Sequence, residues 1–300
     1  MAVEDIFCLV SDSSGERLDR YLSEHYPDYS RTYLQKLISQ GLVTINGQVA
    51  KAGQRLSLGE QIVVTVPPIS PSPLTSEPIP LDIIYQDEDL LVVNKPAGLV
   101  THPAPGRPDH TLLNALLAYL PGLPDTGDAL RPGIVHRLDK DTSGVMVVAR
   151  NATTHTELMN QFKARTVKKI YKVLVRGHLS PEEGTIEADI GRDPRNRQRM
   201  AVVSRGRTAR THYRVIDYPG DYSLLEVKLE TGRTHQIRVH LAAIGYPVVG
   251  DATYGVKSEH LSRQFVHAAS LGFRLPKSGE YREFNAGLPT DLEQALKAVS

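Results

Sequence analysis

The sequence predicts an α+β protein in which a small α/β unit precedes a larger, strand-rich unit. The length of 300 residues suggests about two domains. Proline fills six of the fourteen positions from 67 to 80, and because proline fixes φ and lacks an amide donor, this stretch predicts an extended linker. We therefore expect a small domain at 14–67, a linker at 68–80 and a domain at 81–300. The second domain should hold a mixed, largely antiparallel sheet with flanking helices.

The composition is that of an ordinary globular protein. Apolar residues make up 40% of the chain and charged residues 23%. No apolar run approaches the roughly 20 residues of a membrane helix, and the N-terminus lacks the basic and apolar regions of a signal peptide. The single cysteine, Cys8, excludes an internal disulfide and a multi-cysteine zinc site. We expect a cytoplasmic protein that does not associate with membranes.

Two helices are predicted in the first unit. Leu18, Tyr21 and Leu22 recur at i, i+3 and i+4, which is one face of a helix. Ser30 is suited to cap a second helix, and Gly41 is suited to end it. The inner face of that second helix would carry Leu34, Leu37 and Ile38.

A hairpin and a strand follow these helices. Asn46-Gly47 lies inside an apolar segment at 43–49 and favours the tight turn of a hairpin, and residues 61–66 form a further strand pattern. Two helices, an Asn-Gly hairpin and a strand resemble the S4 RNA-binding domain over about residues 14–67. That resemblance implies RNA contacts from basic residues of the helices, here Arg17, Arg20, Arg31 and Lys36. An accessory domain that binds nothing is the alternative.

The second unit consists mostly of short strand patterns. Residues 111–120 predict a helix with leucines on its inner face, stopped by Pro121-Gly122, and residues 157–164 predict another. The predicted strands are 89–94, 145–149, 169–175, 211–216, 223–229 and 236–240.

Basic residues are concentrated in one segment although the net charge is only +1. Eight arginines and one acid, Asp193, lie between residues 192 and 214. So dense a cluster of one sign is typical of a phosphate-binding face, whereas a single arginine would indicate only a solvated loop.

Three polar elements could carry chemistry. The first, at 133–149, places Asp139 on a loop before an apolar strand, where catalytic groups often lie. Taken alone, Asp139 is more often a turn residue, and Tyr171, in the second element, is more often a packing residue. The third element, at 229–241, contains Arg233 and Arg238, which need an anionic partner such as an aspartate.

Together these elements resemble the pseudouridine synthases that modify large-subunit ribosomal RNA and some transfer RNA. The motif His-Arg-Leu-Asp-x-x-(Thr/Ser)-(Ser/Thr)-Gly is matched at 136–144. Similar pieces lie at 94–98, 102–103 and 250–255. The resemblance covers about residues 14–290, and the order of motifs and the linker resemble the D-type members of the family most.

The resemblance implies a role for each matched residue. Asp139 is the catalytic nucleophile or base, Tyr171 stacks on the target uracil and is a possible proton acceptor, and Arg238 pairs with the aspartate. Arg137 enters the RNA stack that the uridine leaves. We expect further RNA contacts from His136, Lys169, Arg233, Arg31, Lys36, Arg195, Arg197 and Arg199.

The implied reaction requires no cofactor and no metal. Uridine and pseudouridine are isomers, so the reaction gains neither atoms nor electrons, and the sequence holds no phosphate-binding loop or dinucleotide motif. The uridine must first be flipped out of its stack. The aspartate could then attack C1′ or remove the proton at C2′, and both routes stay open.

Several substrates are compatible with the sequence. We expect the partner to be large-subunit rRNA or a pre-ribosomal particle, and the D-type resemblance implies helix 69 of that RNA. The alternatives are a transfer-RNA or dual-substrate enzyme, and a noncatalytic RNA-binding factor in ribosome assembly. We expect a monomer.

Overall fold

A computed structural model describes residues 5–26, 29, 31–51, 53–67, 74–103, 109–124, 131–196 and 198–300. The predicted helix cap at Ser30, the RNA contact at Arg197 and linker residues 68–73 lie outside the described residues. None of the helices in the described ranges has the length and apolar composition that crossing a membrane requires.

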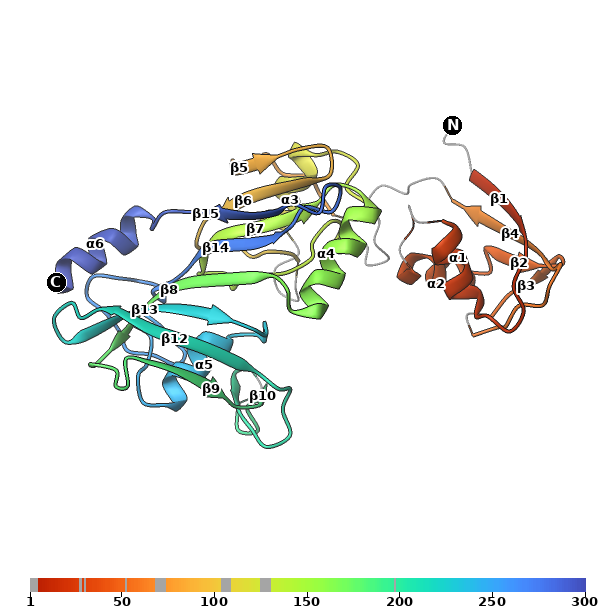
Figure 1. Ribbon diagram of the computed structural model, residues 1–300. Coiled ribbons are helices and arrows are strands. Elements are labelled where there is room, and N and C mark those ends of the chain that lie inside the picture. The colour runs from red at the N-terminus through yellow and green to blue at the C-terminus, as the bar shows by residue number, and fades with distance from the viewer. Residues whose placement is uncertain are drawn as a thin grey trace.

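The first unit is a four-stranded antiparallel sheet packed against two helices (Figure 1). The strands run in the order β1-β4-β2-β3 and are β1 (Asp5–Val10), β2 (Val43–Ile45), β3 (Gln48–Val49) and β4 (Gln61–Val66). Helices α1 (Leu18–His25) and α2 (Arg31–Ser39) bury the apolar faces that their spacing predicts. The two helices, the hairpin and the strand predicted here are therefore confirmed.

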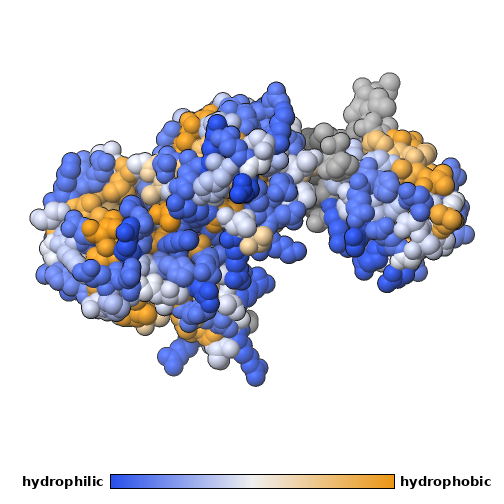
Figure 2. Space-filling view, in the orientation of Figure 1, coloured by the Kyte–Doolittle hydropathy of each residue, from blue (hydrophilic) through white to orange (hydrophobic). Residues whose placement is uncertain are grey.

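The turn between β2 and β3 has the backbone that its sequence predicts. Asn46 and Gly47 both have positive φ, of 50° and 79°, as a type I′ turn requires. Strand β1 was not predicted, because its residues are nearly all apolar and show no alternation. Ile6 and Val10 of β1 are exposed, and Figure 2 shows hydrophobic residues gathered over this strand.

The second unit is built on a nine-stranded mixed sheet, as predicted (Figure 1). Eight strands follow the order β5-β6-β7-β14-β8-β13-β12-β9, and β15 pairs with β14. The strands are β5 (Asp82–Gln86), β6 (Leu90–Lys95), β7 (Ser143–Ala149), β8 (Lys168–Arg176), β9 (Glu183–Glu187), β12 (Arg210–Asp217), β13 (Tyr222–Leu229), β14 (Val266–Arg274) and β15 (Tyr281–Asn285). The pairing of β14 with β7 is parallel, and the other pairings in this sheet are antiparallel.

Four helices and a small hairpin accompany this sheet. The helices are α3 (Leu112–Tyr119), α4 (Ala152–Ala164), α5 (Gln236–Ala243) and α6 (Thr290–Val299), and the hairpin consists of β10 (Ile190–Arg192) and β11 (Met200–Val202). Helix α3 confirms the prediction at 111–120, and Thr111 caps it in a capping box with Asn114. Helix α4 begins five residues before the predicted start at 157.

The prediction of a strand at 236–240 is wrong, since these residues form helix α5. Apolar and polar residues alternate there, which suggested a period of two. In the structure every residue from Gln236 to Leu241 is buried. Polar side chains are buried alongside apolar ones because each has a specific partner, such as Asp251 for Arg238 and Thr211 for His240. The alternation therefore does not distinguish a buried face from an exposed one.

Gly144, which ends the 136–144 motif, permits strands β7 and β14 to approach each other. Gly144 pairs with Ala268 across β7 and β14 and has φ of 120°. A Cβ atom at this position would overlap the carbonyl oxygen of Ala268. Only glycine combines this backbone conformation with this contact, so the motif glycine fixes where β14 meets the strand after Asp139.

Helix α6 is tied to the loop that carries Asp139. The buried Arg263 forms an ion pair with Asp291 of α6, with 2.6 Å between Nε and Oδ2. Its Nη1 donates to the backbone carbonyl of Asp141 at 3.0 Å, and its Nη2 donates to Ser143 Oγ at 3.3 Å. Burial acts to raise the pKa of Asp291, but the hydrogen bond and charge of Arg263 lower it below its ordinary value.

Replacing Asp291 with Asn should therefore destabilise the protein in a pH-dependent way. A lowered carboxyl pKa stabilises the fold above the unfolded value of about 4 and stops doing so as pH falls through the folded value. In urea unfolding at neutral pH, the free energy of unfolding of Asp291→Asn should be lower than that of wild type. This difference should shrink below about pH 4. Glu293→Gln, an exposed acid on the same helix, is the control. A difference that does not change with pH would contradict this role.

Candidate active site

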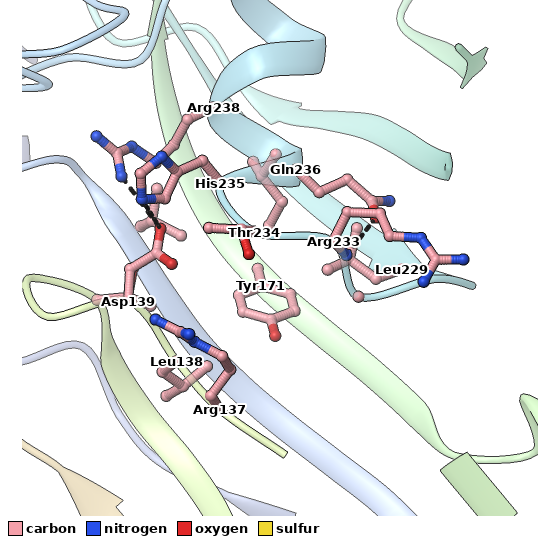
Figure 3. A pocket seen from close by; sticks show the side chains of 14 residues that line it. Arg137, Leu138, Asp139, Tyr171, Leu229, Arg233, Thr234, His235, Gln236 and Arg238 are labelled. Atoms are coloured by element: carbon pink, nitrogen blue, oxygen red, sulfur yellow. Dashed lines mark hydrogen bonds and ion pairs between the residues drawn. The ribbon is translucent and has the colours of Figure 1, made fainter. Parts of the chain in front are cut away.

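A pocket opens where four segments distant in the sequence meet (Figure 3). They are the loop before β7, the middle of β8, the turn from β13 into α5, and the start of β14. Polar residues that line the pocket include Arg137, Asp139, Tyr171, Arg233, His235 and Arg238. The sequence analysis predicted five of these six as site residues.

Arg238 is shared between two carboxylates. It forms a bidentate pair with Asp251, in which Nε donates to Oδ2 at 2.7 Å and Nη2 donates to Oδ1 at 2.9 Å. Its Nη1 donates to Asp139 Oδ2 at 3.1 Å. Burial acts to lower the pKa of Arg238, but the pairing with Asp251 outweighs it, and the pKa is raised. The structure thus brings Arg238 and Asp139 together, as the sequence analysis expected.

Asp251 is a site residue to which the sequence analysis assigned no role. It is buried, and its Oδ1 also accepts from the backbone amides of Thr253 and Tyr254, at 2.8 and 3.1 Å. Burial acts to raise its pKa, but Arg238 and these amides lower it below the ordinary value. The sequence did contain an indication of its importance, since Asp251 lies in the segment 250–255, which is similar to the family.

The loop that carries Asp139 is held by its backbone. Four consecutive carbonyls, from Leu138 to Asp141, each accept a hydrogen bond. Thr101 Oγ1 donates to the first at 3.0 Å and the amide of Thr142 to the second at 3.1 Å. Lys95 Nζ donates to the third at 3.1 Å and Arg263 to the fourth. Because these groups fix the backbone, the direction of the Asp139 side chain is fixed as well.

Lys95 is a fully buried cation beside this loop. Its Nζ also donates to the carbonyls of Pro96 and Leu99, both at 2.8 Å, so three carbonyls share one ammonium group. Burial lowers the pKa of Lys95 to about 7, and the charges of Asp141 and Asp139 oppose this shift. Residues 94–98, which belong to the family resemblance, therefore support the Asp139 loop through Lys95.

Tyr171 lies at the centre of the pocket (Figure 3). It belongs to β8 and is placed between Val227 of β13 and Ala268 of β14. Burial raises the pKa of its hydroxyl well above the ordinary value, and the charge of Asp139 raises it further. The hydroxyl is therefore protonated at neutral pH, and the ring presents an aromatic surface to the pocket.

Two residues that were predicted to contact RNA, His136 and Lys169, have partners within the protein. The ring of His136 stacks on Phe162 of α4 at 4.8 Å, and its Nε2 accepts from the amide of Val147 at 3.0 Å. Burial lowers the pKa of His136 to about 3, so the ring is neutral. Lys169 is buried and donates to the carbonyl of Glu230 at 3.3 Å. Both side chains have partners within the protein, and their predicted RNA contacts stay predictions.

Two further arginines line the pocket. Arg137 is exposed at its rim. Arg233 is half-buried, and its Nε donates to the carbonyl of Thr208 at 3.1 Å. The RNA contacts predicted for these two arginines stay predictions.

The arginine cluster at 192–214 divides into groups with different partners. Arg210 pairs with Glu187 and Glu230, and Arg214 pairs with Glu226, so these two belong to ion pairs on the sheet. Arg199 lies over the ring of Tyr254 and donates to the carbonyl of Thr253. Its predicted RNA contact stays a prediction.

Three further arginines of the cluster line a cavity beside the pocket. Arg195 is not among them and is exposed on the loop between β10 and β11. A second cavity, of about 550 Å³, shares Gly232 to Thr234 with the first pocket. Four arginines line it, namely Arg192, Arg205, Arg207 and Arg233.

In the first unit, a buried carboxylate orders two arginines. Asp19 is fully buried and pairs with Arg17 at 3.0 Å and with Arg31 at 2.8 Å. Arg31 keeps half of its side chain exposed. Lys36 lies 5.9 Å from the ring centre of Tyr33. The predicted RNA contacts of Arg31 and Lys36 stay predictions.

Comparison with known proteins identifies the family. A model of the RNA pseudouridylate synthase family matches residues 89–243, and a model of the S4 domain matches residues 16–62. An uncharacterized RNA pseudouridine synthase of Chloroflexus aurantiacus is 55% identical over 300 residues, which cover 99% of this chain and 94% of that protein. A ribosomal large subunit pseudouridine synthase D of Neisseria meningitidis is 44% identical over 95% of this chain and 79% of that protein.

A solved structure supports the same assignment. Human RNA pseudouridylate synthase domain containing 1 superposes with a TM-score of 0.58 at 35% sequence identity, covering 71% of this chain and 86% of that chain. The chain belongs to the RNA pseudouridine synthase family and carries an S4 domain, as its motifs predicted.

Replacing Asp251 with Asn should destabilise the protein by about 3–5 kcal/mol, because it leaves the buried Arg238 without its bidentate partner. The change keeps the shape of the side chain and removes its charge. Urea unfolding measures the difference, and Asp221→Asn, at an exposed position, should stay within about 0.5 kcal/mol of wild type. If Asp251→Asn behaved like that control, the pair would not hold the site.

Proposed function

We propose that this enzyme converts specific uridines of large-subunit rRNA to pseudouridine, with Asp139 as the reacting carboxylate. One observation carries the assignment of Asp139. Its side chain is 17% exposed at the pocket, while its Oδ2 is held by a buried guanidinium that also has a carboxylate of its own. A carboxylate held in this way keeps a fixed orientation toward bound substrate.

The pocket fits a flipped uridine. The nucleotide leaves its stack at a cost of a few kcal/mol, and its base stacks on the ring of Tyr171. Arg137, at the rim, fills the space that the base has left. Asp139 then faces the ribose and either attacks C1′ or removes the proton at C2′. Because its hydroxyl stays protonated, we assign Tyr171 the stacking role, and the proton at C5 leaves through water.

The second cavity fits the backbone of the same RNA strand. Its four arginines lie next to the residues that line the catalytic pocket, so phosphates beside the flipped uridine would meet positive charge. Figure 2 shows hydrophilic side chains projecting from the end of the molecule that carries β9 and β10. The S4 domain, predicted at 14–67, would contact the same RNA through Arg31 and Lys36.

The choice of RNA rests on the relatives. Those named ribosomal large subunit pseudouridine synthase D favour rRNA over transfer RNA, and the D-type resemblance favours helix 69. We propose that the enzyme acts in the cytoplasm, as a monomer, on rRNA or a pre-ribosomal particle. A noncatalytic assembly factor is disfavoured, because Asp139, Tyr171 and Arg238 are all present in one pocket.

Asp139→Asn should abolish modification while leaving RNA binding nearly unchanged. The amide cannot act as nucleophile or base, although its shape is the same. Pseudouridine maps of rRNA and tRNA from a deletion strain, complemented with wild type or with Asp139→Asn, measure this. The maps also reveal the target. If the deletion strain lost pseudouridines only from tRNA, the assignment to rRNA would be refuted. If Asp139→Asn restored the lost pseudouridines, the catalytic role of Asp139 would be refuted.

Arg205→Gln and Arg207→Gln should each weaken RNA binding and reduce the salt dependence of the binding constant. Both side chains are exposed in the second cavity, and each lost phosphate contact lowers the slope of log K against log salt by about 1. Titrations at several salt concentrations measure the slope. Arg274→Gln, at an exposed position outside both cavities, is the control. Equal slopes for all variants would place the RNA backbone elsewhere.

A further inference from the structure

His235 faces Asp139 across the pocket, and neither the family resemblance nor the proposed function gives it a role. It stands just before α5 with φ of 58°, in the left-handed region. A non-glycine residue with this backbone is strained, and such strain often occurs at functional sites. Its Nε2 lies 3.9 Å from Asp139 Oδ2 (Figure 3). That separation exceeds a hydrogen bond, so both groups face the same space without bonding each other.

Tyr254 holds the other nitrogen of His235. The distance from Tyr254 Oη to His235 Nδ1 is 2.9 Å. The same oxygen accepts a hydrogen bond from the backbone amide of Met200, in β11, at 2.7 Å. The Tyr254 ring lies between two guanidinium groups, with Arg199 and Arg238 each 5.0 Å from its centre. One tyrosine therefore contacts Arg238, His235 and the hairpin of β10 and β11, which we call the arginine-rich hairpin.

This network favours one tautomer of His235. The amide of Met200 can only donate, so Tyr254 Oη accepts from it. The hydroxyl hydrogen of Tyr254 is then available to His235 Nδ1, and this arrangement gives each group of the network a partner. A neutral ring with an acceptor at Nδ1 carries its hydrogen on Nε2. The hydrogen on Nε2 points into the pocket beside Asp139.

The electrostatic environment favours these protonation states. Burial lowers the pKa of His235, and Arg238 and Arg137 add to this effect, while Asp139 and Asp251 oppose it. The ring is therefore neutral at physiological pH. Burial raises the pKa of Tyr254, so its hydroxyl keeps its hydrogen, although the Met200 amide and the two arginines act in the opposite direction.

We propose that His235 is a catalytic residue whose Nε2–H donates a hydrogen bond to O2 of the flipped uracil. The proposal rests on the proposed function. When the C1′–N1 bond breaks, the departing uracil gains negative charge that is shared by N1, O2 and O4. O2 is the carbonyl next to the glycosidic bond, so it lies close to the carbon that Asp139 faces. A donor fixed in advance stabilises this charge as it develops, and the proton stays on the histidine.

Tyr254 is the positioning residue in this arrangement. It contacts Nδ1 of His235, the guanidinium of Arg238, the guanidinium of Arg199 and the amide of Met200. A shift of the hairpin when RNA binds would therefore reach both His235 and Arg238 through one side chain.

The test is a set of single-turnover measurements on the full-length enzyme. The probe is an RNA stem-loop that carries the uridine identified by the pseudouridine maps. His235→Asn tolerates the left-handed backbone but its amide is too short to reach O2. His235→Gln places an N–H near the position of Nε2. We expect His235→Asn to lose on the order of 100-fold in rate with little change in RNA affinity, and His235→Gln to recover part of that loss.

Modified substrates identify the acceptor. Sulfur accepts hydrogen bonds weakly, so 2-thiouridine at the target should reduce the ratio between wild-type and His235→Asn rates toward one. The matched substrate with 4-thiouridine should leave the ratio unchanged. The third substrate carries 2′-deoxyuridine at the target. If this substrate brought the ratio of wild-type to His235→Asn rates to one and 2-thiouridine did not, the acceptor would be the ribose hydroxyl. The assignment to O2 would then be overturned.

A spectroscopic measurement tests Tyr254 separately. In enzyme with ¹⁵N-labelled histidine, the two ring nitrogens of His235 should show the Nε2–H tautomer, and Tyr254→Phe should show a mixture of tautomers and a slower single turnover. An unchanged tautomer in Tyr254→Phe would overturn the positioning role. Wild-type enzyme that modifies no RNA would refute the proposed function, whereas active wild type with His235→Asn equally fast would refute only this inference.

Discussion

The active site depends on the way in which Arg238 is held between two carboxylates. A buried guanidinium is stable only when its charge is compensated and its donors are satisfied. Asp251 does both with a bidentate pair, and this leaves Nη1 directed at Asp139. The carboxylate of Asp139 is therefore oriented by Arg238 of α5, which is itself oriented by Asp251.

The same logic explains why so many buried polar groups surround the pocket. Lys95 and Arg263 each donate to one of two adjacent carbonyls of the loop, those of Lys140 and Asp141. Neither side chain enters the pocket. Both make the loop rigid, so that Asp139 keeps its direction when substrate binds.

Much of this arrangement could be predicted from the sequence, and the failures have physical causes. Apolar spacing predicted α1 and α2, because each of these helices has one buried face. The leucine-rich segment at 111–120 predicted α3, in which Leu112 to Leu116 are all buried. Apolar spacing failed at α5, where polar residues are buried together with apolar ones through specific partners. Strands β9 and β15 were missed because they are short and mostly exposed.

The candidate site shows a similar division. The motif at 136–144 indicated Asp139, and its resemblance to a family indicated Tyr171 and Arg238. The RNA contacts predicted for His136 and Arg199 stay predictions, since local sequence does not reveal that both side chains also contact an aromatic ring within the protein. His235 and Asp251 required the three-dimensional contacts, because their partners lie far away in the chain or across a turn.

The position of β14 has a consequence for synthesis on the ribosome. This strand lies between β7 and β8, yet it is made nearly a hundred residues after β8. Until it emerges, the part of the sheet that follows Asp139 and the part that carries Tyr171 have no strand to join them. Such non-local pairing forms late, because the intervening chain must first be closed into a loop. A growing chain therefore remains unable to modify RNA until its last strands have folded.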